Sequence, residues 1–157
     1  MIRWIENVSM SDIHLGHHSD LGDNTMLIRI QDPATEFMPT KYNFKEVHCF
    51  EFLDAEDSDG FDEDFKISDA QAEQLVALLF KAIDQNMNVM VHCHAGICRS
   101  GAVVEVGEMM GFTPTERFRS PNIRVKHRMM KALGLTYDSS EQAAHDSWRF
   151  MKLAWEQ

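Results

Sequence analysis

A cysteine and an arginine stand six positions apart in the segment HCHAGICRS, residues 92–100. An apolar run precedes this segment and a helical pattern follows it, which predicts a tight loop between a strand and a helix. The N–H groups of such a loop can converge on one point and bind an anion, helped by the dipole of the helix. Gly96 gives the loop backbone freedom, and the planar guanidinium of Arg99 can hold two phosphate oxygens at once. The segment therefore predicts a phosphate-binding loop.

The thiol of Cys93 would lie at the base of this loop. The positive partial charges around it favour the thiolate near neutral pH, and a thiolate placed there can attack the phosphorus of a bound phosphate ester. Ser100 is placed to donate a hydrogen bond to the sulfur when it leaves again, and His94 is placed to face the substrate. The plainer alternative is a buried structural cysteine and an unrelated surface arginine.

The pattern His92-Cys93-x-x-Gly96-x-x-Arg99-Ser100 resembles the signature loop of the cysteine-dependent protein tyrosine phosphatases. It is most similar to the small dual-specificity branch, including its bacterial and phage-type members, although Cys98 stands where that branch often has serine. The resemblance implies a two-step hydrolysis through a phosphocysteine on Cys93, with no metal or organic cofactor. It also implies that the substrate phosphate is bound by the loop residues His94, Ala95, Gly96, Ile97, Cys98 and Arg99.

Such a hydrolysis needs a general acid for the leaving oxygen and then a base for water, and one carboxyl group can serve as both. In the family this group is an aspartate on a loop after the strand upstream of the signature. Asp54 directly follows an alternating strand, and Phe52-Leu53-Asp54 resembles the family's aromatic-x-Asp strand end, so we expect Asp54 to be this residue. The loop from there to the next helix is longer than in compact members, which leaves Asp57 and Asp62 open.

Three cysteines are too few for a disulfide framework and direct attention to thiol chemistry. Either Cys98 or Cys49 is a candidate for a reversible disulfide with oxidised Cys93, which would protect that thiol from over-oxidation. We expect His92 to hydrogen-bond backbone groups beneath the thiolate and fix the loop, the alternative being a metal site shared with His94. Residues 12–20 are rich in His and Asp but lack compelling metal-ligand spacing, so we expect an exposed turn there and no metal.

Apolar or alternating runs predict strands at residues 2–8, 25–31, 46–53 and 88–92. Ser68 and Gln71 form a capping-box pattern that predicts a helix over 68–86. Further helices are expected over 100–110, over 121–133 with Pro121 in its first turn, and from about Ser140 onward. The last helix would place four apolar side chains on one face: Ala144, Trp148, Met151 and Trp155.

Strands that alternate with helices predict an α/β fold. We expect one compact domain over residues 1–157, with a central, largely parallel sheet of about four to five strands flanked by helices. The signature loop would connect one of these strands to a helix.

The chain of 157 residues carries a formal net charge of -10, which argues against general binding to nucleic acid or to anionic membranes. No apolar run approaches the roughly 20 residues of a membrane-spanning helix, and the first residues lack a signal-peptide pattern. We therefore expect a cytoplasmic protein.

The charge is unevenly distributed along the chain. Residues 51–69 hold nine acids and one base, whereas residues 117–131 hold six bases and no acid. The plain interpretation is that each run is a solvated face. A positive end formed by residues 117–131 would instead favour acidic substrates.

The five residues between Cys93 and Arg99 include no Lys or Arg, so the loop itself does not select a polyanionic inositol lipid or an RNA triphosphate end. A phosphorylated protein or peptide is therefore the expected partner, with phosphotyrosine first and phosphoserine or phosphothreonine also open. The alternatives are a phosphoinositide or RNA 5′-phosphatase and a non-catalytic phosphate-binding module. Sulfur transfer and arsenate reduction also use anion-cradling cysteine loops, but Ser100 and the helix pattern after it favour a phosphatase.

Overall fold

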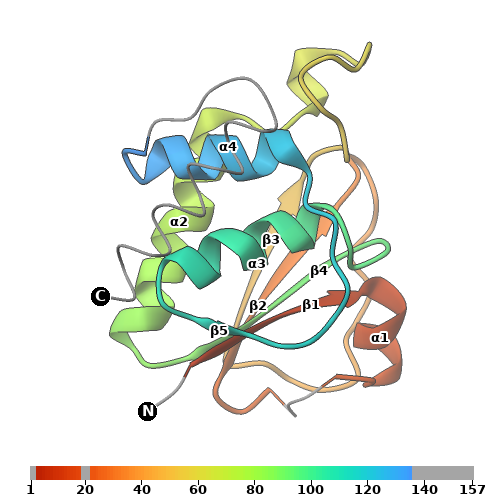
Figure 1. The fold of residues 1–157 in the computed structure, drawn as a ribbon. Helices are drawn as coiled ribbons and strands as arrows, with labels where there is room; N and C mark the ends of the chain where they lie inside the picture. Colours follow the sequence, from red (N-terminus) through yellow and green to blue (C-terminus); the bar gives the residue numbers. More distant parts are fainter. Residues whose placement is uncertain (1–2, 19–21, 136–157) are drawn as a thin grey trace.

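A sheet of five strands forms the centre of the computed structural model, which describes residues 3–18 and 22–135 (Figure 1). The strands are β1 (Trp4–Ser9), β2 (Thr25–Gln31), β3 (Glu46–Glu51), β4 (Asn88–Cys93) and β5 (Thr113–Pro114). They lie in the order β3-β2-β4-β1-β5, and every neighbouring pair is parallel. The predicted α/β fold with a largely parallel sheet is confirmed, and the two-residue strand β5 is an addition that the sequence did not indicate.

The described residues also form four α-helices and one short 3-10 helix, of which all but the last lie between strands along the chain. They are α1 (Met10–Leu15), η1 (Glu63–Phe65), α2 (Asp69–Asp84), α3 (Arg99–Met109) and α4 (Ile123–Ala132). The predicted capping box is present, because the Ser68 side chain accepts from the Gln71 N–H and the Gln71 side chain accepts from the Ser68 N–H. The sequence therefore located the helices at 68–86, 100–110 and 121–133 to within a few residues.

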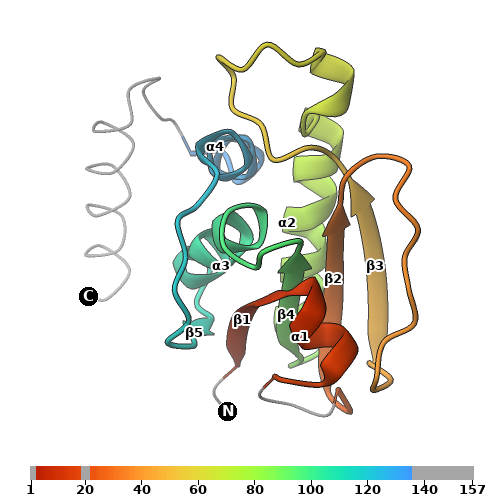
Figure 2. The same ribbon diagram turned by 90° about the vertical axis from the view of Figure 1, so that its right-hand side faces the viewer.

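Two hydrophobic clusters hold the layers together. The larger cluster packs α2, α3 and α4 against the side of the sheet that carries Val89 and Val91, and α4 lies on α2 and α3 (Figure 2). The smaller cluster joins Ile13 of α1 to Val8, Leu27 and Met90. Val89 and Val91 share one cluster while Met90 belongs to the other, as the alternation of side chains along a strand requires. Strand β4 is therefore buried on both faces, which explains its continuous apolar run.

Two expectations about local structure were wrong. Of the stretch 12–20 expected to be an exposed turn, residues 12–15 instead belong to helix α1, because Ser9 and Asp12 make a capping box that starts a helix. Pro121 precedes α4 instead of opening it, because the side chain of Asn122 accepts the Val125 N–H and is the N-cap. The helix expected from Ser140 lies outside the described residues. Within the described ranges, no helix has both the length and the apolar character needed to cross a membrane.

Candidate active site

The carboxyl ends of the parallel strands bring the predicted site residues to one edge of the sheet. Ser9 at the end of β1 is in register with Cys93 at the end of β4, and Gln31 at the end of β2 is in register with Glu51 at the end of β3. The segments that leave these strands therefore meet above the same edge. Cys93 is buried, with 2% of its surface exposed.

The carbonyl groups of the signature loop, residues 93–99, are bound by the protein around the loop. The Met10 N–H donates to His94 O at 3.2 Å and the Asn7 amide to Gly96 O at 2.7 Å. The Ser120 N–H donates to Ile97 O at 3.2 Å, and the N–H groups of Ala102 and Asn122 donate to Cys98 O, both at 3.0 Å.

A trans peptide holds the C=O of one residue and the N–H of the next on opposite sides. The described residues contain no cis peptide bond. Because the carbonyl groups at positions 94, 96, 97 and 98 are bound from outside the loop, the following N–H groups point to its inside. These N–H groups belong to Ala95, Ile97, Cys98 and Arg99, and among the described residues none of them donates a backbone hydrogen bond. The loop therefore forms a ring of N–H donors suited to an anion.

Glycine is required at one position of this ring. Gly96 has φ +74°, and a Cβ placed on it would lie 2.4 Å from the carbonyl carbon of Val8 and 2.5 Å from the nitrogen of Ser9. A side chain there would meet the backbone of β1, which cannot move aside. The sequence-based expectation that Gly96 supplies backbone freedom agrees with this geometry.

Helix α3 begins where the signature loop ends. Its N-cap residue, Cys98, makes no side-chain cap hydrogen bond, so no side chain competes for the first N–H groups of this eleven-residue helix. The next residue after Arg99 is Ser100, whose Oγ lies 3.2 Å from the Cys93 Sγ. The helix therefore adds its dipole and a hydroxyl group to the surroundings of the thiol.

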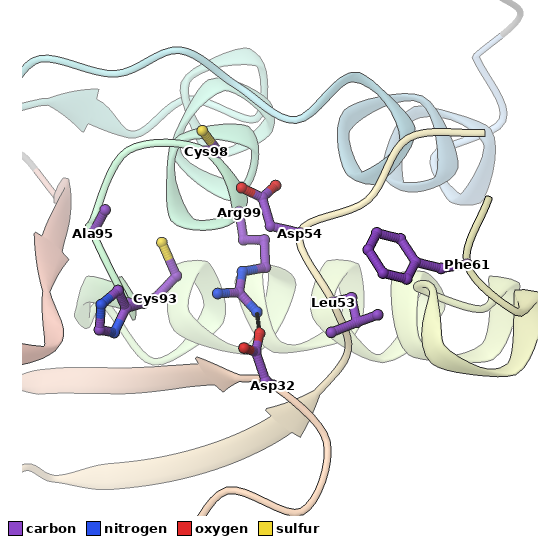
Figure 3. Close-up of a pocket in the computed structure, with 9 residues that line it drawn as sticks. Asp32, Leu53, Asp54, Phe61, Cys93, Ala95, Cys98 and Arg99 are labelled. Carbon is purple, nitrogen blue, oxygen red and sulfur yellow. Dashed lines mark hydrogen bonds and ion pairs between the residues drawn. The ribbon is translucent and has the colours of Figure 1, made fainter. Parts of the chain in front are cut away.

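The guanidinium of Arg99 is held on one side by the protein. Its Nη1 donates to the carboxylate of Asp32 at 2.7 Å, the dashed line in Figure 3, and to the Phe52 carbonyl, also at 2.7 Å. Its Nε is buried and has no partner among the described residues. The edge formed by Nε and Nη2 is thus left for a ligand. Sequence reasoning missed Asp32, although its position directly after a buried strand that ends at the same sheet edge was an available signal.

His92 lies beneath the loop, where a hydrogen bond with the backbone of Cys93 agrees with the expectation and a hydrogen bond from an arginine is added to it. The Arg29 Nε donates to the His92 Nε2 at 3.0 Å, so the ring is neutral and carries its proton on Nδ1. Burial lowers the pKa of His92 to about 3, and the charge of Arg29 acts in the same direction. The neutral ring fixes the end of β4 without adding a charge next to Cys93.

A pocket of about 290 Å³ opens above the thiol. It is lined by Asp32, Leu53, Asp54, Phe61, Cys93, His94, Ala95, Cys98 and Arg99 (Figure 3). Of the residues predicted to surround the phosphate, Gly96 and Ile97 do not line this pocket. Gly96 packs against β1, and the contribution of Ile97 is its inward N–H.

Asp54 lies in this pocket, whereas the two alternative acids are engaged elsewhere. Its Oδ1 accepts from the side chain of Asn122 at 2.8 Å, which fixes the carboxylate. Asp57 binds Arg124 at 2.8 Å, and Asp62 caps η1 by accepting the Asp64 N–H. Of these three acids, only Asp54 therefore lines the pocket that holds the Cys93 thiol.

Residues 54–66, which we call the acid loop, are held in place by two buried cations. The ammonium of Lys66, whose side chain is 1% exposed, donates to the carbonyls of Asp57 and Asp59 and to Glu63. Arg124 of α4 binds Asp57 and Glu63. The acids of the run remain exposed, apart from the partly buried Glu56, as a solvated face predicts, while the two buried cations fix the path of the loop.

The basic run 117–131 does not form a free positive surface. Arg117 binds Glu6 and Asp12, and Arg119 binds Glu105 and Glu108. Arg124, Arg128 and Lys131 each bind acids from residues 57–69. Since these bases are paired with acids of the same molecule, the idea that they attract acidic substrates loses its basis.

The other two cysteines differ in their access to Cys93. Cys98 lines the same pocket, and burial together with the nearby charge of Asp54 raises the pKa of its thiol. Cys49 is in register with Arg29, which is in register with His92, so Cys49 lies two strands away from β4. Two strand spacings amount to roughly 10 Å, beyond the roughly 7 Å between Cα atoms that a disulfide tolerates. A disulfide between Cys49 and Cys93 is therefore excluded in this fold.

No cluster of three His, Cys, Asp or Glu side chains suited to a metal ion occurs within residues 3–18 and 22–135. His92 and His94 accordingly do not belong to such a cluster. The pocket itself presents two thiols, two carboxyl groups, one imidazole and one arginine, together with the inward N–H groups of the loop.

No protein-family model matches the sequence, and no curated protein matches it significantly. Among solved structures, the chain is similar to human DUSP28 with 12% identity and a TM-score of 0.46, covering 97% of this chain and 93% of that chain. It is similar to OH1 from the Orf virus, described as a tyrosine phosphatase with triple substrate specificity, with 13% identity and a TM-score of 0.48 over 98% of this chain and 69% of that chain.

A third similar structure is the human tyrosine phosphatase-like serine/threonine/tyrosine-interacting protein, with 14% identity and a TM-score of 0.42 over 85% of this chain and 79% of that chain. These structures come from the dual-specificity and tyrosine phosphatase group, the group that the signature loop resembles. At such identities and TM-scores the likeness says nothing about chemistry, which rests on the geometry of the site.

Proposed function

We propose that this protein is a cysteine-dependent phosphatase that hydrolyses phosphate monoesters through a phosphocysteine on Cys93. The observation that carries this proposal is the ring of inward N–H groups above a buried thiol, completed by the free edge of Arg99. An anion held by that ring has its central atom directly above the sulfur. A module that only bound phosphate would need the donors but not the thiol.

In the first step, the sulfur of Cys93 forms a bond to phosphorus while the bond from phosphorus to the ester oxygen breaks. The equatorial oxygens are held by the loop N–H groups and by Arg99, which Asp32 and the Phe52 carbonyl keep in orientation. Asp54 in its protonated form gives its proton to the leaving oxygen, and Asn122 aims the carboxyl group. The products are a free alcohol and a phosphocysteine.

In the second step, the Asp54 carboxylate takes a proton from a water molecule, whose oxygen forms the new bond to phosphorus. The bond between sulfur and phosphorus breaks, and the thiolate that leaves is stabilised by the hydroxyl of Ser100 at 3.2 Å. Inorganic phosphate is released, and the enzyme returns to its starting state.

Phosphorylated protein is the proposed substrate class, with phosphotyrosine first. The described pocket contains one arginine and no lysine, which is too little positive charge for a polyanionic inositol lipid or a triphosphate end. Asp32 and Asp54 add negative charge at its mouth. Both facts favour a monoester with a single phosphate.

Turnover of para-nitrophenyl phosphate by the reduced full chain tests the proposal, with Cys93→Ser as the first control. We expect phosphate release by the wild type and a loss of at least about 10⁴-fold in Cys93→Ser. A panel of phosphopeptides, inositol lipids and triphosphate RNA then identifies the substrate class. A well-folded wild type that releases phosphate from none of these compounds would contradict the proposal.

The general acid is tested with a phosphate ester that has a poor leaving group. We expect Asp54→Ala to slow its hydrolysis about a hundredfold or more while phosphate still binds. Asp57→Ala and Asp62→Ala are matched controls from the same loop and should retain most of the activity. If Asp57→Ala or Asp62→Ala shows the large loss instead, the assignment moves to that residue.

A further inference from the structure

An aromatic side chain of the acid loop stands at the mouth of the pocket without being buried. Phe61 is 56% exposed and lines the pocket together with Leu53 and Asp54. In Figure 3 its ring points toward the side of the pocket that Asp54 and Leu53 occupy, across from the signature loop. Phe65 of the same loop is also 49% exposed but does not line the pocket. An exposed ring at a pocket rim gains contact area when a ligand arrives.

The segment that carries this ring is held from both sides. Lys66 donates to the carbonyls of Asp57 and Asp59 at 3.2 and 2.8 Å, just before Phe61. After Phe61, Asp62 caps η1, and the Leu53 N–H donates to the Phe65 carbonyl at 2.8 Å. The backbone that carries the ring therefore does not have to be ordered when a ligand binds, which limits the entropy lost there.

The position of Asp54 defines where the leaving group of a substrate lies. A general acid must come within hydrogen-bond distance of the leaving oxygen, so the ester group has to pass Asp54 on its way out of the ring of N–H donors. Leu53 and Phe61 flank that path. A phenyl ring attached to the leaving oxygen would offer its apolar faces to these two side chains, whereas phosphoserine offers only a single methylene at that position.

We propose that Phe61, with Leu53, forms an apolar wall that packs on the ring of a phosphorylated tyrosine and makes the site prefer aryl over alkyl phosphates. The effect of this wall on turnover rests on the proposed function. The inference deepens that function by naming a specificity-determining residue. Offset or edge-to-face packing of two aromatic rings together with their buried area is worth about tenfold in affinity.

The test compares a phosphotyrosine and a phosphoserine peptide with the same flanking sequence. The measured quantity is the ratio of their kcat/KM values for the wild type, Phe61→Ala and Phe61→Tyr. We expect this ratio to fall about tenfold in Phe61→Ala, mainly through KM for the phosphotyrosine peptide, and to be retained in Phe61→Tyr because the ring remains. The matched control Phe65→Ala removes a similarly exposed ring from the same loop and should leave the ratio unchanged.

Two outcomes would overturn the inference: an unchanged ratio in Phe61→Ala, or the same fall in Phe65→Ala. Binding of both peptides to Cys93→Ser, measured by calorimetry, separates this inference from the proposed function. If the wild type releases no phosphate, the proposed function fails, yet the binding ratio still reports whether Phe61 selects the aryl ring. If the ratio of the two peptides' binding constants is the same with and without the Phe61 ring, the proposed apolar wall is refuted.

Discussion

The signature loop and the acid loop face each other across one pocket, but the protein holds them by different means. The signature loop is fixed by neutral hydrogen bonds to its carbonyl groups, which come from Met10, Asn7 and the segment before α4. The acid loop is fixed by the charged side chains of Lys66 and Arg124. Neutral backbone contacts are insensitive to salt and pH, whereas ion pairs respond to both.

This difference follows from what each loop must do. The signature loop has to present several N–H groups to one point, so its backbone must be rigid to a fraction of an ångström. The acid loop has to place one carboxyl group and one aromatic ring, which requires a fixed path of the chain but not a particular direction of every peptide. Changes in the first loop should therefore abolish function, while changes in the second should weaken it.

Gly96→Ala should have the largest effect on either loop. The added Cβ would meet the backbone of β1 at 2.4 Å, and φ +74° is strained for alanine. We expect the free energy of unfolding to fall by about 3 kcal/mol in a urea titration, with activity lost. Gly60→Ala is the matched control in the acid loop, because a Cβ there meets nothing within 4 Å. Equal effects of the two substitutions would contradict the comparison.

Arg124→Gln should come next, because it removes the buried cation that joins the acid loop to α4. The carboxylates of Asp57 and Glu63 and the carbonyl of Ile67 lose a partner, and we expect a loss of about 2 kcal/mol in stability. Turnover of a poor leaving group should fall about tenfold, since Asp54 is less well placed.

The same cation gives the acid loop a pH dependence. The hydrogen bond from Arg124 lowers the pKa of Glu63, and Lys66 adds to it. A lowered pKa in the folded state means that this contribution is present above the usual pKa of the carboxyl group and is lost as the pH falls through the lowered value. In Arg124→Gln the stability that is lost on lowering the pH should be smaller than in the wild type. An unchanged loss of stability at low pH would contradict the contribution of this ion pair.

His92→Gln tests the support beneath the signature loop through its pH response. In the folded protein the pKa of His92 is lowered to about 3 from 6.5, so the unfolded chain binds more protons between these values. Stability should therefore fall as the pH drops below 6.5, by about 1.4 kcal/mol between about pH 7.5 and 5.5. Gln keeps an acceptor for Arg29 without titrating, so the variant should lack this part of the slope in thermal melts. An identical slope in both proteins would show that His92 is not the titrating group.

Asp69→Asn should have the smallest effect. Asp69 binds Arg128 at 2.8 Å and Lys131 at 3.2 Å, but its side chain is 49% exposed. Exposed ion pairs are screened, so we expect a change of about 0.5 kcal/mol or less, and no change in turnover. A loss as large as that of Arg124→Gln would mean that surface charge, and not the buried guanidinium, holds the acid loop.

The sequence alone determined the local features of this protein. The period of apolar residues located the four longer strands and three of the helices, and the capping box at Ser68 marked the start of α2. The segment from Cys93 to Ser100 could be interpreted residue by residue because strand, loop and helix follow one another along the chain. Such features depend on neighbours in sequence, and a single sequence contains them in full.

The tertiary structure decided what lies opposite that loop and what holds it. Three features of the site come from segments that only the parallel sheet brings together. Asp32 binds Arg99, Arg29 donates to His92, and Phe61 lines the pocket mouth. The choice among Asp54, Asp57 and Asp62 was likewise open in the sequence, because all three lie in one acidic run. All three are exposed, and only their partners and the pocket distinguish them: Asp54 lines the pocket, whereas Asp57 binds Arg124, which lies more than sixty residues away along the chain. Contacts of this kind depend on how distant segments pack, which the local pattern of residues does not encode.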